Sequence, residues 1–85
     1  MMARINMYVT TWCPYCAQAK QLLRSLGASW EETNIDQMGM TRAELAGLTG
    51  GYTVPQIVIN GQPIGGFDDL YALNVSGQLQ DLLQD

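Results

Sequence analysis

The two cysteines of this chain lie only two residues apart, in the stretch Cys13-Pro14-Tyr15-Cys16. A segment whose apolar residues alternate as in a β-strand precedes this stretch, and a segment with helical spacing follows it. A cysteine at the start of a helix lies close to unpaired backbone amides, which favour the negative charge of a thiolate. Because the thiolate is the nucleophilic form of cysteine, the stretch predicts a thiol–disulfide redox site.

Helical spacing gives the two thiols different surroundings. The segment after Cys16 carries apolar residues at i, i+3, i+4 and i+7, which form the buried stripe of a helix: Ala19, Leu22, Leu23 and Leu26. Cys16 precedes Ala19 by three residues and belongs to this stripe, whereas Cys13 precedes the helix. We therefore expect Cys13 to be open to substrates and Cys16 to be shielded. Pro14 suits the first helical position, and Gly27 is expected to end the helix.

The rest of the chain alternates between strand and helix patterns. The predicted strands cover residues 5–9, 29–35, 56–59 and 62–64. The predicted helices cover residues 17–26, 40–48, a segment that Asp68 and Asp69 can cap, and residues 77–83. Thr41 and Glu44 indicate a capping box for the second helix, Asn60-Gly61 is typical of a tight hairpin, and residues 36–39 are expected to be a connection.

This order, β-α-β-α-β-β-α-α, predicts an α/β fold with a four-stranded mixed sheet flanked by helices. A strand–helix–strand unit requires a right-handed crossover between parallel strands, and the hairpin adds an antiparallel edge. The strand at 5–9 has apolar residues on both faces and is expected to be central, with both faces covered. The strand at 29–35 is less apolar and suits an edge. The helix at 40–48 is expected to cover one face of the sheet.

Size and charge exclude several functions. The 85 residues carry a net charge of −4 and only four basic side chains, so the basic surface expected of a nucleic-acid or membrane binder is absent. No apolar run approaches the roughly 20 residues of a membrane-spanning helix, and the N-terminus lacks the pattern of a secretory signal. We expect one domain over residues 1–85, monomeric and cytoplasmic, because two cysteines at redox spacing suit a reducing compartment.

The Cys-x-x-Cys pattern has two other interpretations. It can be half of a zinc site, but tetrahedral zinc needs four nitrogen or sulfur ligands, and this chain has no histidine and no third cysteine. We therefore expect no metal site within the chain. The pair can also consist of two structural cysteines that happen to be close. The strand–helix junction favours the redox interpretation over both.

Three segments together resemble the signature segments of dithiol glutaredoxins, which have a thioredoxin-like fold. They are Cys-Pro-Tyr-Cys at 13–16, Thr-Val-Pro-Gln-Ile at 53–57 and Gly-Gly-Phe-Asp-Asp-Leu at 65–70. The resemblance covers essentially the whole chain. It implies a glutathione-dependent oxidoreductase that reduces protein disulfides and glutathione mixed disulfides, with Cys13 as nucleophile and Cys16 as resolving thiol. Glutathione is then the reducing co-substrate, no cofactor is tightly bound, and the partners are disulfide-bearing or glutathionylated proteins.

The resemblance also implies which residues contact glutathione. Val54, before a cis proline, would pair through its backbone with the cysteinyl part. At the γ-glutamyl end, Gly65-Gly66 would let the backbone approach closely, helix amides would bind the carboxylate, and Asp69, with Asp68, would meet the ammonium group. One aspartate can also cap the helix. The full set of predicted contacts is Tyr15, Thr53, Val54, Pro55, Gly66, Phe67, Asp68 and Asp69.

The chain departs from this family where a cation is usual. Many relatives have a lysine three residues before the first cysteine, where this chain has Thr10. They often have a basic or amide side chain before Thr-Val-Pro, where this chain has Gly51 and Tyr52. These groups bind the glycyl carboxylate of glutathione, so we expect weaker glutathione binding and a less stabilised Cys13 thiolate. Arg42 can replace the missing cation, but we expect it to be an exposed helix arginine.

Two rival functions stay open. One is a glutaredoxin-like electron donor reduced by thioredoxin reductase, which the missing basic groups favour and the Gly-Gly-Phe-Asp-Asp segment disfavours. The other is a module that binds or delivers a [2Fe–2S] cluster, held between two chains by their first cysteines and by glutathione. Family members specialised for clusters usually read Cys-Gly-Phe-Ser, whereas this chain reads Cys-Pro-Tyr-Cys.

Overall fold

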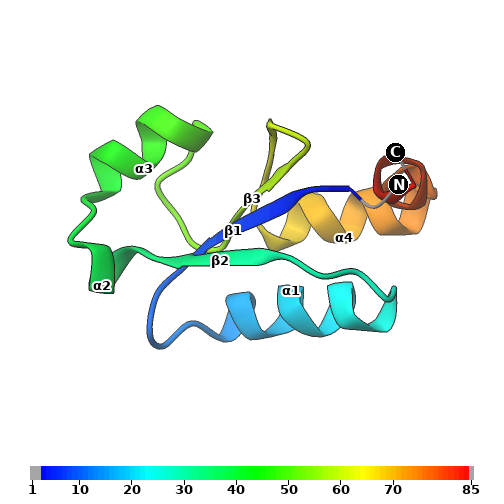
Figure 1. The fold of residues 1–85 in the computed structure, drawn as a ribbon, viewed down its shortest axis with the longest axis horizontal. Coiled ribbons are helices and arrows are strands. Elements are labelled where there is room, and N and C mark those ends of the chain that lie inside the picture. The colour runs from blue at the N-terminus through cyan, green and yellow to red at the C-terminus, as the bar shows by residue number, and fades with distance from the viewer. Residues whose placement is uncertain (1–2, 85) are drawn as a thin grey trace.

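A computed structural model describes residues 3–84 and contains the predicted mixed sheet. Its strands are β1 (Ile5–Val9), β2 (Glu31–Asn34), β3 (Gln56–Ile59) and β4 (Gln62–Gly65). Its helices are α1 (Pro14–Ser25), α2 (Ile35–Met38), α3 (Arg42–Thr49), α4 (Phe67–Ser76) and α5 (Gln78–Leu83). The sheet order is β2-β1-β3-β4 (Figure 1), with β1 parallel to β2 and antiparallel to β3, and β4 antiparallel to β3. The prediction of an α/β fold with a central first strand and an edge second strand is therefore confirmed.

The connection expected at residues 36–39 is instead mostly a short helix, α2. Asn34 explains the difference, because its side-chain oxygen accepts the backbone N–H groups of Asp36 and Gln37 at 3.0 and 3.2 Å. An asparagine that caps a helix in this way ends the strand before it, so β2 stops at Asn34; β2 also begins at Glu31, two residues later than expected. Gly39, with φ of 68°, ends the turn in the left-handed region.

Two local motifs confirm the sequence-based predictions. The Thr41 hydroxyl accepts the Glu44 N–H, and the Glu44 carboxylate accepts the Thr41 N–H, each at 3.0 Å, so the predicted capping box starts α3. Asn60 and Gly61 have φ of 53° and 80°, the positive values of a tight turn between β3 and β4. Because Thr41 is the cap, α3 begins two residues later than expected.

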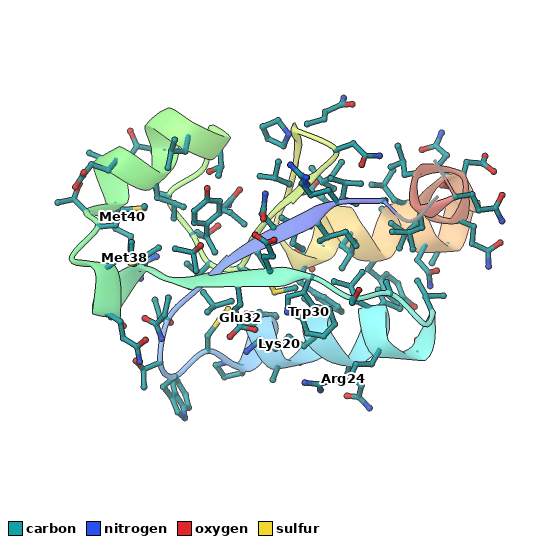
Figure 2. The ribbon with its side chains drawn as sticks, in the orientation of Figure 1. Lys20, Arg24, Trp30, Glu32, Met38 and Met40 are labelled. Atoms are coloured by element: carbon teal, nitrogen blue, oxygen red, sulfur yellow. A yellow bond between two sulfur atoms is a disulfide. The ribbon has the colours of Figure 1, made fainter. Side chains whose placement is uncertain are left out.

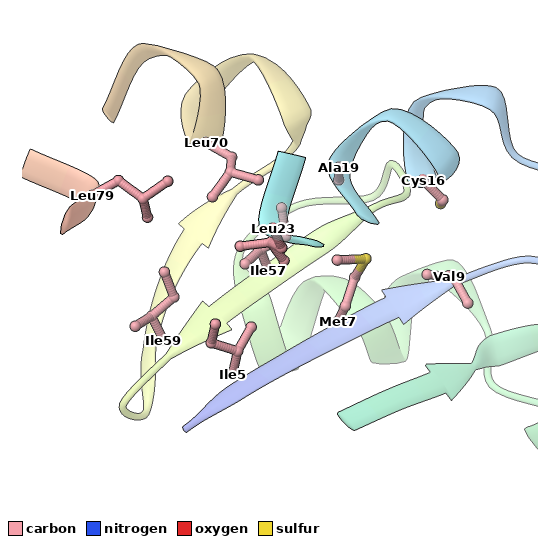
Figure 3. Packing of buried hydrophobic residues seen from close by; sticks show 10 residues of the cluster. All are labelled: Ile5, Met7, Val9, Cys16, Ala19, Leu23, Ile57, Ile59, Leu70 and Leu79. Atoms are coloured by element: carbon pink, nitrogen blue, oxygen red, sulfur yellow. The ribbon is translucent and has the colours of Figure 1, made fainter. Parts of the chain in front are cut away.

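One face of the sheet carries the main core (Figure 3). Alternate residues of β1 are buried there against α1, α4 and α5, and Cys16 is part of the same cluster. The buried cluster comprises Ile5, Met7, Val9, Cys16, Ala19, Leu23, Ile57, Ile59, Leu70 and Leu79. The other face of β1, with Asn6 and Tyr8, is only half-buried, so it is covered less than expected. Helix α3 contacts β3 and buries Leu45.

The strand order brings three distant loops to one end of the sheet. Tyr8, near the end of β1, pairs with Gln56 at the start of β3, and Ile57 pairs with Gly65 at the end of β4. The loop after β1, the loop before β3 and the start of α4 therefore meet. No helix in residues 3–84 is long and apolar enough to cross a membrane.

Candidate active site

The two cysteines form a disulfide at the start of α1. Cys13 is the N-cap residue, and its Sγ accepts the backbone N–H of Cys16 at 3.1 Å. Pro14 occupies the first helical position, as expected, where its missing N–H removes no helical hydrogen bond. The Cys16 N–H at this helix start therefore points at the sulfur of Cys13, where it would stabilise a thiolate.

The cysteines differ in exposure in the direction expected from helical spacing. Cys16 is 2% exposed and packs in the core, because it lies on the same helix stripe as Ala19 and Leu23. Cys13 is half-buried, so it is less open than expected but more accessible than Cys16. A disulfide partner in solution can reach Cys13 far more easily than Cys16.

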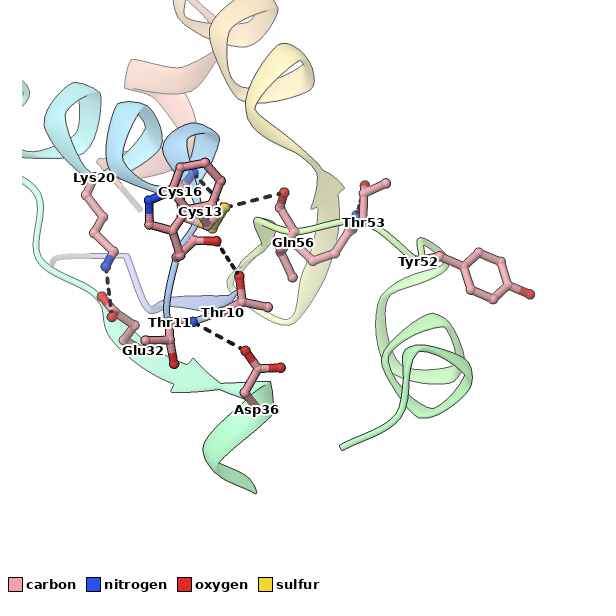
Figure 4. The surroundings of a disulfide bond; sticks show 12 residues. Thr10, Thr11, Cys13, Cys16, Lys20, Glu32, Asp36, Tyr52, Thr53 and Gln56 are labelled. Carbon is pink, nitrogen blue, oxygen red and sulfur yellow. Dashed lines mark hydrogen bonds and ion pairs between the residues drawn. A yellow bond between two sulfur atoms is a disulfide. The ribbon is translucent and has the colours of Figure 1, made fainter. Parts of the chain in front are cut away.

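The loop before β3 lies against the disulfide (Figure 4). The carbonyl oxygen of Val54 is 3.7 Å from the Sγ of Cys13, a van der Waals contact, since neither atom carries a hydrogen in the oxidised protein. The peptide bond between Val54 and Pro55 is cis, as the family resemblance implied. The loop before β3 thus contacts Cys13 through the backbone carbonyl of Val54.

A groove of about 520 Å³ extends from this loop to the start of α4. It is open to solvent and has both polar and apolar walls. All eight residues predicted to contact glutathione line it, namely Tyr15, Thr53, Val54, Pro55, Gly66, Phe67, Asp68 and Asp69. The rings of Tyr15 and Phe67 stack with centroids 6.5 Å apart and form one wall beside the disulfide. Three segments that are distant in the sequence therefore form a single groove.

The far end of the groove is built by two glycines and an aspartate. Gly66, rather than an aspartate, is the N-cap residue of α4, and its N–H donates to the Asp69 carboxylate at 3.0 Å. The prediction that Asp68 and Asp69 cap this helix is thus correct for Asp69 only, and Asp69 caps from within the first turn. A Cβ on Gly65, which has φ of 118°, would overlap this carboxylate, and a Cβ on Gly66 would lie 3.4 Å from the Pro55 carbonyl.

Thr10 stands where many relatives have a lysine, and Arg42 is the candidate replacement for the missing positive charge. The Thr10 hydroxyl donates to the Trp12 carbonyl at 3.2 Å and brings no charge to the disulfide. Arg42 is exposed, as expected, but it is tied to the loop before β3, because its Nη1 donates to the Tyr52 carbonyl at 2.9 Å. The description of Arg42 as an ordinary exposed helix arginine is therefore incomplete.

A second, smaller cavity of about 360 Å³ is lined by Cys13 and Cys16 and extends toward Thr10 and Lys20. Lys20 forms an ion pair with Glu32 at 2.9 Å, and the Trp30 indole donates to the same carboxylate at 3.1 Å (Figure 2). Partial burial raises the pKa of Glu32, but the hydrogen bonds from Lys20 and Trp30 and the nearby positive charges of Lys20 and Arg24 outweigh it and hold this pKa below its usual value.

Sequence reasoning missed two residues of the site, Gln56 and Thr49. Both line the groove and both are buried. A glutamine at the start of a strand and a threonine at the end of a helix are usually exposed, so the polarity pattern does not single them out. The one signal for Gln56 was its place in the Thr-Val-Pro-Gln-Ile segment. Across residues 3–84, no three His, Cys, Asp or Glu side chains gather in a way that suits a metal ion.

Comparison with known proteins agrees with this geometry. Residues 5–64 match the family model described as Glutaredoxin. The chain is 48% identical to Glutaredoxin 3 of Escherichia coli, over 98% of this chain and 100% of the relative. It is 48% identical to a glutaredoxin of Pseudomonas aeruginosa, over 96% of this chain and 98% of that one.

Solved structures are also similar. The crystal structure of a buckwheat glutaredoxin–glutathione complex has a TM-score of 0.86 and 32% identity, over 94% of this chain and 76% of that chain. The holo form of glutaredoxin C1 from Populus tremula x tremuloides has a TM-score of 0.87 and 35% identity, over 95% of this chain and 83% of that chain. The chain therefore belongs to the glutaredoxins, a family of thiol oxidoreductases with the thioredoxin-like fold.

Proposed function

We propose that this protein is a glutathione-dependent oxidoreductase that reduces protein disulfides and glutathione mixed disulfides. The groove supports the proposal, because every predicted glutathione contact lines it and one of these residues, Val54, contacts Cys13 through its carbonyl oxygen. A tripeptide whose cysteinyl backbone pairs with Val54 would present its sulfur to Cys13. The buckwheat relative, solved in a complex with glutathione, supports the choice of ligand.

With a glutathione mixed disulfide, the Cys13 thiolate attacks the glutathionyl sulfur. A new S–S bond forms, the original S–S bond breaks, and the other thiol leaves as a thiolate that takes up a proton from water. A second glutathione, as thiolate, then attacks the sulfur of the glutathione held on Cys13. Glutathione disulfide leaves, and Cys13 is released as a thiolate. The backbone N–H of Cys16 stabilises the Cys13 thiolate at the start and at the end of this cycle.

With a protein disulfide, Cys16 supplies the second thiol. Cys13 attacks one sulfur of the substrate and forms a mixed disulfide with it. The Cys16 thiolate then attacks Cys13, the substrate leaves as a dithiol, and the internal disulfide forms. Two glutathione molecules reduce this disulfide and leave as glutathione disulfide. Because Cys16 is buried next to Cys13, the Cys16 thiolate reaches the Cys13 sulfur more readily than it reaches the sulfur of any external disulfide.

The proposed glutathione contacts follow from the chemistry of the groove. The N–H groups of Phe67 and Asp68 lie at the start of α4, where they favour the γ-glutamyl carboxylate. Asp69 uses one oxygen to accept the Gly66 N–H, which leaves the other for the γ-glutamyl ammonium group. Arg42, beside the Tyr52 carbonyl, supplies the cation for the glycyl carboxylate in place of the residues absent from this chain.

We also propose an oligomeric state, a compartment and a class of partners for this protein. We infer that residues 1–85 act as one monomeric glutaredoxin domain in the cytoplasm, where glutathione keeps thiols reduced. Its protein partners would be disulfide-bearing or glutathionylated proteins, with no nucleic acid or membrane involved.

The test is glutathione-coupled reduction of a small glutathione mixed disulfide by wild type, Cys13→Ser and Cys16→Ser. We expect Cys13→Ser to lose activity and Cys16→Ser to keep most of it, because only Cys13 is needed for this substrate. Loss of activity in Cys16→Ser together with survival in Cys13→Ser would reverse the assigned roles. Replacing glutathione with NADPH and thioredoxin reductase tests the rival electron donor, and faster turnover by the reductase would overturn the proposed reductant.

A further inference from the structure

Two polar side chains are buried in the part of the chain that the structure describes, and both hold the same loop. Thr49 is 8% exposed and Gln56 is 4% exposed. Thr49 ends α3 and Gln56 starts β3, so they stand on either side of the loop at 50–55. This loop carries Thr53, Val54 and Pro55, three of the proposed glutathione contacts.

The amide of Gln56 lies beneath this loop and is held in place from two sides. Its Nε2 donates to the Thr53 hydroxyl oxygen at 3.3 Å. On another side, a Cβ on Gly51 would lie 2.5 Å from Nε2, so the amide occupies space that only a glycine leaves open. The Thr49 hydroxyl fixes Gly51, since it accepts the Gly51 N–H at 3.3 Å and donates to the Leu45 carbonyl at 2.9 Å.

This contact determines which way the Thr53 hydroxyl acts. A hydroxyl has one hydrogen to donate and two lone pairs that accept. Because the Gln56 amide occupies a lone pair of Thr53 from below, the hydroxyl hydrogen is left for a partner in the groove. Burial of an amide is unfavourable without such a partner, and Gln56 is 4% exposed on the face of β3 opposite Ile57 and Ile59. An apolar residue at 56 would fill this place without orienting Thr53.

We propose that Gln56 is a positioning residue for the glutathione groove. It holds the Thr53 hydroxyl as a hydrogen-bond donor toward a carbonyl or carboxylate oxygen of the ligand. The inference rests on the proposed function, because it assigns Gln56 to the glutathione-binding half of the same site. It places no requirement on the chemistry at Cys13, because the hydrogen bond of the amide goes to Thr53.

The kinetic test is a double-mutant cycle of Gln56→Met and Thr53→Val, with the glutathione mixed disulfide as the varied substrate. We expect each single variant to raise KM about three- to tenfold, the effect of one lost neutral hydrogen bond, with kcat and the thiolate titration of Cys13 unchanged. If Gln56 acts through Thr53, the double variant has the KM of Thr53→Val alone. A wild-type KM in Gln56→Met, or single effects that multiply in the double variant, would overturn the proposal. Gln62→Met, an exposed glutamine of β4, is the matched control.

A second measurement needs neither turnover nor a folded Gln56 variant. In wild-type protein without glutathione, the side-chain NH₂ of Gln56 should exchange slowly with solvent by nuclear magnetic resonance. In Thr53→Val it should shift and exchange faster, because its acceptor is gone. Unchanged Gln56 signals in Thr53→Val would overturn the proposal, even if the wild type does not turn over glutathione mixed disulfides. A wild type with no turnover but with the expected NH₂ response would overturn only the proposed function.

Discussion

The guanidinium of Arg42 and the carbonyl of Tyr52 are joined by a hydrogen bond of 2.9 Å, which ties α3 to the loop before the cis peptide bond. Arginine has five N–H donors in a planar fork, so this contact leaves others for an anion. The guanidinium therefore lies close to the position where many glutaredoxins have a basic or amide side chain and this chain has Tyr52. We infer that Arg42, on the neighbouring helix α3, can supply the positive charge that this loop lacks.

We predict that Arg42→Gln raises the KM for a glutathione mixed disulfide about tenfold, because a charge-assisted hydrogen bond to the glycyl carboxylate is lost. Arg42→Lys keeps the charge but loses the fork, and should fall between the two. Steady-state kinetics at two ionic strengths measure the effect, which should shrink at high salt. Arg4→Gln is the control, since Arg4 precedes β1 at the opposite end of the sheet. An equal loss in both variants would show a general charge effect and contradict the assignment.

We predict that Thr10→Lys strengthens the site. A lysine at this position brings positive charge to the loop before Cys13, where the wild-type hydroxyl only donates to the Trp12 carbonyl. The thiolate fraction at neutral pH should rise, and the KM for glutathione substrates should fall about tenfold or more, the value of a well-made contact to a charged group. Ultraviolet absorbance of the thiolate, titrated against pH, measures the first effect.

The control for this prediction is Thr10→Gln, which has similar length and no charge. It should titrate and turn over like the wild type. Identical titration curves and kinetics for wild type and Thr10→Lys would show that the missing lysine has no consequence in this protein, which would leave Arg42 as a sufficient cation.

Much of this architecture follows from patterns that are local in the sequence. Alternation predicts β1 because every second residue enters the core, and the 3.6-residue period separates Cys13 from Cys16 because only one of them lies on the buried stripe. The convergence of the segments at 13–16, 53–57 and 65–70 follows from strand order, since the loops that flank paired strands meet at one end of the sheet. The groove is a consequence of topology.

What the sequence did not predict depends on contacts between side chains and distant backbone. The Arg42 contact requires the path of the loop at 50–55, which the sequence does not encode in any periodic pattern. Gln56 is buried because Gly51 leaves space above it, a relationship across five residues of irregular loop. The helix α2 was missed because four residues are too few to show a period, and its main support is the single Asn34 cap.

We predict that Gly65→Ala damages the groove as well as the fold. The residue has φ of 118°, which is unfavourable for alanine, and the new Cβ would overlap the Asp69 carboxylate. The carboxylate must move, so the cap on the Gly66 N–H is lost and the proposed γ-glutamyl site is disturbed. We expect a loss of stability of about 1 kcal/mol or more together with a raised KM for glutathione substrates.

Gly77→Ala separates the two effects. Gly77 ends the same helix, α4, with φ of 85°, but a Cβ there would meet no atom within 4 Å. We expect this variant to lose stability by a similar backbone cost and to keep the wild-type KM. Urea unfolding and steady-state kinetics on both variants make the comparison. A raised KM in Gly77→Ala would mean that destabilisation alone weakens the site.

We predict that Glu32→Gln reduces stability at neutral pH and has no effect in acid. The pKa of Glu32 is below its usual value in the folded protein, so the unfolded chain binds this proton more readily and stability falls as the proton goes on. The contribution is therefore present above the unfolded pKa of about 4.3 and is lost as pH falls through the lower, folded pKa. Because the Glu32 side chain is 38% exposed, solvent screens the pair with Lys20, and we expect about 0.2–1 kcal/mol.

Urea unfolding at pH 7 and at pH 3 measures this contribution of Glu32. Glu31→Gln is the matched control, because Glu31 is also exposed, lies next to Glu32 in β2, and points to the opposite side of the strand. Wild type and Glu32→Gln should differ at pH 7, and the difference should shrink as the pH falls through the lowered folded pKa of Glu32. The control should show no comparable difference at either pH. If Glu32→Gln and Glu31→Gln behave alike at pH 7, net charge rather than the contacts with Lys20 and Trp30 would account for the effect.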